Sequence, residues 1–86
     1  MGRKDKRLDR FLARPKDYTF EELCTLLNGF GYELDNKGGT SGSRVRFYRE
    51  KDEATIDLHK PHDPKYLKRY QIDYIIGKLK ENGDIE

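Results

Sequence analysis

The segment from Gly38 to Arg49 constrains the fold more than any other part of the chain. It begins with three glycines in five residues, a composition typical of a polar loop, and continues with alternating apolar and polar side chains. Successive side chains of a strand point to opposite faces, so Val45 and Phe47 share one face. The other face carries two cations and an aromatic ring, on Arg44, Arg46 and Tyr48. One face therefore suits a hydrophobic core, and the other carries fixed positive charge.

Two interpretations of this segment stay open. Glycine lacks a Cβ, so the backbone N–H groups of the loop can approach a phosphate closely, and the neighbouring arginines can bind an anionic polymer such as RNA. Loops rich in Gly, Ser and Thr are also ordinary hairpin connections, and an Arg/Tyr face is often the solvated side of an antiparallel sheet. The RNA-binding interpretation selects Gly42, Ser43, Arg44, Arg46 and Tyr48.

Helical signals lie on both sides of this segment. The sequence Thr19-Phe20-Glu21-Glu22 is a capping box that predicts a helix start, and a glycine at position 29 or 31 ends that helix. A second apolar stripe at helical spacing runs from Leu67 to Leu79, before a C-terminal cap at Gly83. Gly77 inside this helix indicates close backbone packing or a tolerated defect, at a cost of about 1 kcal/mol relative to alanine.

Three strands are expected between the helices, over Tyr32–Lys37, Arg44–Glu50 and Ala54–His59. The sequence therefore predicts an α+β fold with two layers in the order α-β-β-β-α. Two helices cover one face of a three-stranded antiparallel sheet. Double-stranded-RNA-binding domains share this order of elements.

The chain has 86 residues, which predicts one domain over 1–86. Its first 18 residues hold seven Lys or Arg against three Asp. They are expected to form a basic N-terminal segment that packs weakly, with a short helical turn that Pro15 ends. The single cysteine, Cys24, excludes an internal disulfide, and no Cys/His cluster indicates a metal site. No membrane segment and no signal peptide are evident, so a cytoplasmic protein without a metal or a small-molecule cofactor is expected.

Positive charge recurs before and at the start of the second helix. Two prolines in the segment Lys60–Pro64 predict a connector there, because proline removes a donor and fixes φ. The cations around this connector are further candidates for RNA binding, provided that the fold brings them near the arginines of the strand. They are Lys60, Lys65, Lys68 and Arg69.

Taken together, three pieces of this sequence resemble the HicA family of bacterial toxins, and the similarity covers nearly the whole chain. They are the Gly29–Leu34 entry into the first strand, Gly42-Ser43 before the second strand, and Pro61-His62 before the helix that begins near Lys68-Arg69-Tyr70-Gln71-Ile72. The resemblance implies a double-stranded-RNA-binding-like fold and the activity of an mRNA interferase. It also implies mRNA and a HicB-type antitoxin as partners.

The resemblance further implies a catalytic histidine directly after the Gly-Ser pair, where this chain has Arg44. Metal-free RNA cleavage needs a base for the 2′-hydroxyl proton, and imidazole suits this task because it titrates near neutral pH. A guanidinium stays protonated, so Arg44 can bind a phosphate but cannot act as the base. The catalytic candidates are therefore His62, if the connector folds back, together with Arg44. A solvated His62 is the competing interpretation.

Two alternatives to a ribonuclease stay open. The chain can be a catalytically impaired module that binds RNA or the antitoxin, because position 44 lacks the histidine. It can also be a domain that binds only protein, through an exposed aromatic patch on Tyr48, Tyr66, Tyr70 and Tyr74. Core packing of most of these tyrosines is the more ordinary expectation.

Overall fold

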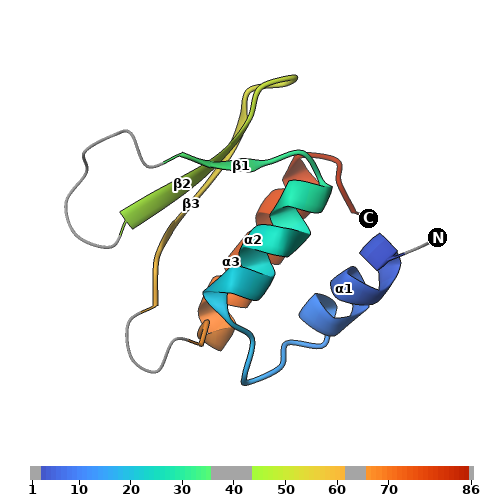
Figure 1. Cartoon of the computed structure of the whole chain (residues 1–86), viewed down its shortest axis with the longest axis vertical. Coiled ribbons are helices and arrows are strands. Elements are labelled where there is room, and N and C mark those ends of the chain that lie inside the picture. Colours follow the sequence, from blue (N-terminus) through green and yellow to red (C-terminus); the bar gives the residue numbers. More distant parts are fainter. Residues whose placement is uncertain (1–2, 36–43, 62–65, 86) are drawn as a thin grey trace.

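The computed structural model describes residues 3–35, 44–61 and 66–85. The described part has three helices and one three-stranded sheet. These elements are α1 (Arg3–Leu12), α2 (Phe20–Gly29), β1 (Glu33–Asp35), β2 (Arg44–Arg49), β3 (Ala54–His59) and α3 (Arg69–Glu81). Figure 1 shows α2 and α3 against one face of the sheet, with α1 beyond them. The predicted α+β fold with its α-β-β-β-α order is confirmed, and α1 is added in front of it.

The sheet is antiparallel with the strand order β1-β2-β3. Phe47 of β2 and Ile56 of β3 are opposite each other and fully buried under the helices. The ring of Phe20 lies 6.0 Å from that of Phe47 and so links α2 to the sheet. This apolar face, predicted from the alternation of β2, supplies one side of the core. The strand β1 begins at Glu33 and not at Tyr32 as expected, because Tyr32 turns into the core instead of pairing with β2. The predicted residues Asn36 and Lys37 lie outside the described residues.

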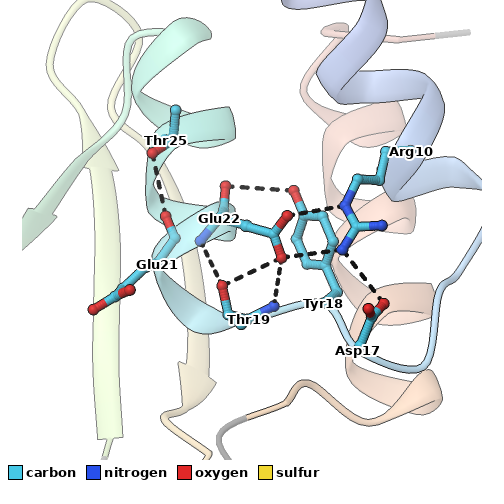
Figure 2. Close-up of polar contacts among 7 residues, drawn as sticks. All are labelled: Arg10, Asp17, Tyr18, Thr19, Glu21, Glu22 and Thr25. Atoms are coloured by element: carbon cyan, nitrogen blue, oxygen red, sulfur yellow. Dashed lines mark hydrogen bonds and ion pairs between the residues drawn. The ribbon is translucent and has the colours of Figure 1, made fainter.

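The capping box at the start of α2 is present as predicted (Figure 2). The Glu22 backbone N–H donates to the Thr19 hydroxyl at 3.1 Å, and the Thr19 backbone N–H donates to the Glu22 carboxylate at 3.0 Å. The same carboxylate accepts from Arg10 of α1 at 2.9 Å. The Arg10 hydrogen bond, together with the Thr19 backbone, lowers the pKa of Glu22. One carboxylate thus caps α2 and holds α1 to it.

The N-terminal segment packs more firmly than the sequence predicted. Its helix has 10 residues instead of a single turn, and Phe11 is fully buried, with its ring 5.1 Å from that of Tyr18. Arg14, at φ 55°, breaks the helical path before Pro15 and forms an ion pair with Asp73 of α3. The reason is tertiary: α1 carries the apolar residues Leu8, Phe11 and Leu12, which pack against the core of the domain.

Candidate nucleic-acid interface

Five exposed residues with ionisable side chains lie where β2 begins, β3 ends and α3 begins. We call this group the basic end; it consists of Arg44, His59, Lys60, Lys68 and Arg69. The register of the sheet pairs Arg44 with His59, so the two side chains leave the same face of the sheet. The ammonium group of Lys60 lies 5.4 Å from the centre of the Phe20 ring, at the start of α2.

Hydrogen bonds from the start of α3 hold the basic end together. The side-chain amide of Gln71, which is 7% exposed, donates to the carbonyl oxygen of His59 at 2.9 Å and accepts from the backbone N–H of Lys68 at 3.0 Å. The backbone N–H of Leu67 donates to the carbonyl of Tyr18 at 2.8 Å. One buried glutamine therefore fixes the end of β3 against the start of α3, and the starts of both helices lie together (Figure 1).

Three cations of the basic end have no ion pair within the described residues. No described carboxylate forms an ion pair with Lys60, Lys68 or Arg69. The first turn of α3 has no acidic residue, whereas that of α2 has Glu21 and Glu22. A helix N-terminus carries partial positive charge, so cations at the start of α3 cost stability in the absence of an anion. This arrangement favours the binding of phosphate.

A shallow groove adds apolar surface to the basic end. Its lining consists of Phe20, Cys24 and Pro61 together with the polar side chains of Thr19, Glu21 and Lys60. Burial raises the pKa of the Cys24 thiol, as expected for a small core residue and not for a nucleophile. The groove offers an apolar surface next to a cation, an arrangement that suits the base and the phosphate of a nucleotide.

Arg46 and Tyr48 lie on the same face of the sheet as Arg44, but in different surroundings. The guanidinium of Arg46 binds Asp57 through two hydrogen bonds of 2.7 and 3.3 Å, and this pairing lowers the pKa of the Asp57 carboxyl. Tyr48, two residues further along β2, is half-buried and is opposite Glu33 of β1 on one side and Thr55 of β3 on the other. The open face of the sheet is therefore of mixed charge, which the strand sequence did not indicate. Arg46 has to release the carboxylate of Asp57 before it can bind a phosphate.

Four predicted site residues, Gly42, Ser43, His62 and Lys65, lie outside the described residues. Of the others, the structure brings Arg44, Lys60, Lys68 and Arg69 to one end of the domain. It places Arg46 and Tyr48 further along the sheet.

The expectation that most of the tyrosines pack in the core is wrong. Tyr66, Tyr70 and Tyr74 are 44%, 68% and 45% exposed, and Tyr48 is half-buried. The buried tyrosines are instead Tyr18 and Tyr32. Tyr70 and Tyr74 lie four residues apart on the solvent side of α3, because the opposite side of that helix is filled by its isoleucines. An aromatic surface is thus present beside the basic end.

Sequence reasoning missed the role of Arg49 at the other end of β2. Its side chain is 6% exposed and pairs with Asp84 at 2.6 Å and Asp52 at 2.7 Å. It also donates to the carbonyl of Phe30 at 3.0 Å and lies over the ring of Tyr32. The Tyr32 hydroxyl donates to Asp84 at 2.7 Å and accepts from the side-chain amide of Asn82 at 2.8 Å. We call Arg49, Asp52, Asp84, Tyr32 and Asn82 the clamp. The signal was present, because Arg49 has the same strand parity as Val45 and Phe47 and so belongs to the core face.

Within the described ranges, no group of three or more His, Cys, Asp or Glu side chains is arranged to hold a metal ion. No helix in the same ranges is long and apolar enough to cross a membrane. Neither result identifies an activity.

The comparison with protein families gives a direct assignment. Residues 20–83 match the family described as the HicA toxin of bacterial toxin-antitoxin systems. The chain belongs to the HicA toxin family. The matched range begins at the first residue of α2 and contains the sheet, all residues of the basic end and α3, while α1 and Thr19 lie outside it. Searches of curated proteins and of solved structures returned no significant match. Membership implies a toxin that acts within a toxin-antitoxin system and has an antitoxin as partner.

Proposed function

We propose that this HicA-family chain binds mRNA at its basic end and cleaves it as a metal-independent endoribonuclease in the cytoplasm. In this proposal a HicB-like antitoxin neutralises the toxin. The observation that carries RNA binding is the exposure of three cations, Lys60, Lys68 and Arg69, where both α2 and α3 begin, with no ion pair to a described carboxylate. The family match supplies the toxin context.

The residues of the basic end have separate tasks in this proposal. Arg44 binds the scissile phosphate, while Lys60, Lys68 and Arg69 bind phosphates along the strand. Arg46 and Tyr48 extend the surface, together with Gly42, Ser43 and Lys65 of the predicted set. An imidazole takes the 2′-hydroxyl proton, and the chain contains two histidines, His59 and His62.

A second candidate function is favoured by Arg44 itself. A guanidinium cannot act as a base, so a chain that relied on position 44 for catalysis would only bind RNA or the antitoxin. The exposed Tyr70 and Tyr74 suit such binding to a protein, because tyrosine is enriched in interfaces. This candidate predicts RNA or antitoxin binding without cleavage at any excess of protein.

RNA binding is tested by measuring the affinity for a labelled single-stranded RNA at increasing salt concentration. The variant Lys60→Gln/Lys68→Gln/Arg69→Gln removes three cations of the basic end. If each holds one phosphate, the slope of log K against log salt falls in magnitude by about 2, since a single-strand phosphate contributes about 0.7.

The matched control for this experiment is Lys80→Gln, which removes an exposed cation from the last turn of the same helix. We expect its salt dependence to equal that of the unmodified protein. Equal slopes for the triple variant and the control would place the RNA elsewhere and overturn the proposed surface.

A further inference from the structure

The register between β2 and β3 places an imidazole directly opposite Arg44. We propose that His59 is the general base of RNA cleavage and that Arg44 holds the scissile phosphate beside it. This inference rests on the proposed ribonuclease function and assigns its base to a strand residue. His59 belongs to the described part of the chain, whereas His62 lies outside it.

Geometry supports this pairing. Arg44 and His59 form the first cross-strand pair of the β2–β3 ladder, at the edge of the described sheet. Directly opposed residues of an antiparallel pair have Cβ atoms about 4.5–5.5 Å apart on the same face. Both side chains are exposed, so an RNA strand can reach them together. A phosphodiester bound to the guanidinium then has its own 2′-hydroxyl beside the imidazole.

The position of His59 is fixed by its backbone, which leaves its side chain available for chemistry. Its carbonyl oxygen accepts the hydrogen bond from the buried Gln71 amide, so the end of β3 is held to α3. No side chain in the described ranges forms a hydrogen bond with the imidazole. The contact with Gln71 uses only the backbone of His59, so the fold does not depend on a histidine side chain at this position.

Arg44, directly opposite His59, supplies positive charge that the reaction needs. Lys60 follows His59 directly and has no described carboxylate partner, but its ammonium group lies 5.4 Å from the centre of the Phe20 ring, on the helix side of the sheet. Cations placed around the phosphate stabilise the extra negative charge of a phosphorane transition state. His59 thus lies next to one cation in the sequence and opposite another in the sheet.

The proposed step is an internal transesterification. The imidazole of His59 takes the proton of the 2′-hydroxyl, and the 2′-oxygen attacks the adjacent phosphorus. The bond from phosphorus to the 5′-oxygen breaks, and the imidazolium returns the proton to that departing oxygen. The products are a 2′,3′-cyclic phosphate and a 5′-hydroxyl, with no net gain or loss of protons or electrons.

The test compares the full chain with three variants, His59→Ala, His62→Ala and Arg44→Ala, on labelled single-stranded RNA in the presence of a chelator. We expect the unmodified protein to cleave and to leave cyclic phosphate ends. His59→Ala should lose at least 100-fold in rate while keeping its RNA affinity, because general acid–base groups contribute about 10²–10⁴-fold. His62→Ala should retain its activity, and thermal melting of each variant checks that it is folded.

Chemical rescue separates a base from a positioning residue. Free imidazole in the buffer should restore part of the activity of His59→Ala, but not that of Arg44→Ala, because only the former lacks a proton acceptor. Restored cleavage that is proportional to the imidazole concentration supports the assignment. Failure of imidazole to restore any cleavage, with the variant folded and able to bind RNA, overturns it.

The remaining outcomes separate this inference from the proposed function. If the unmodified protein cleaves and His59→Ala cleaves equally well, the base is elsewhere and only the inference fails. Loss of activity in His62→Ala alone would assign the base to the connector. If the unmodified protein binds RNA but never cleaves it, both the inference and the proposed cleavage fail, and a binding module is left.

Discussion

The two ends of β2 differ in how the fold accommodates positive charge. At its first residue, Arg44 is exposed opposite His59; at its last residue, Arg49 is buried between Asp52 and Asp84. About 17 Å separates these residues along the strand, at about 3.4 Å per residue. A buried charge needs its counter-ions within the chain, whereas an exposed charge can bind an anion from outside. Burial therefore distinguishes Arg49, a structural arginine, from Arg44, which solvent and an external anion can reach.

The largest expected effect comes from breaking the clamp. Arg49→Met removes the cation that contacts Asp84, whose side chain is only 10% exposed, and leaves a carboxylate in a nearly dry position. We expect a loss of about 3–5 kcal/mol in the free energy of unfolding, measured by urea denaturation. A domain of this size has about 5–15 kcal/mol in total, so the variant should be close to unfolding.

The matched control for this prediction is Arg46→Met on the same strand. It breaks an equally short ion pair, Arg46 with Asp57, but in exposed surroundings, where the side chain of Arg46 is 56% exposed. Solvent screens an exposed pair and its side chains lose entropy on pairing, so the loss should be far smaller than that of Arg49→Met. Equal losses in the two variants would show that burial does not distinguish these arginines.

An intermediate effect is expected from alkaline pH. Burial, together with the hydrogen bond to Asp84, raises the pKa of Tyr32 to about 12. The protonated phenol is therefore favoured in the folded state, so its contribution to stability is complete below pH 10 and is lost as the pH rises towards 12. The expected loss is about 1–3 kcal/mol from this residue.

Urea denaturation at pH 9 and at pH 11.5 measures this loss, and Tyr32→Phe should reduce it. Tyr18, near the basic end, also has its pKa raised to about 12 by burial, so part of the alkaline loss should persist in that variant. A pH dependence that Tyr32→Phe leaves unchanged would show that the clamp does not control the ionisation of this phenol.

The smallest expected effect concerns α3, the helix that runs from the basic end to the clamp. An ideal Cβ on Gly77 has no neighbouring atom within 4 Å in the described structure. Close packing is therefore not the reason for this glycine, and the tolerated defect is the interpretation that fits. Gly77→Ala should raise the free energy of unfolding by about 0.5–1 kcal/mol, as measured by thermal or urea denaturation. RNA binding should be unchanged. A lower free energy of unfolding in this variant would instead show that the glycine is needed for a close contact.

Much of the fold was predictable because its signals are local. The capping box at Thr19 and Glu22 involves residues three positions apart, and the alternation from Val45 to Phe47 assigns a strand with a core face. The firm packing of α1 was not predictable, because the burial of Phe11 depends on contacts with later parts of the chain. The start of β1 depended in the same way on the place of Tyr32 in the core.

The features of the candidate site can also be separated into those set by local sequence and those set by tertiary contacts. By itself, the sequence determined the order of the elements, the family resemblance, and the cations from which the basic end is built. Only the tertiary structure decided that Arg46 is neutralised by Asp57, that Arg49 is joined to Asp84, and that His59 is opposite Arg44. Propensities, caps and alternation depend on neighbours within a few residues. Ion pairs and strand register depend on which distant segments the hydrophobic core brings together, and this is decided only when the whole chain packs.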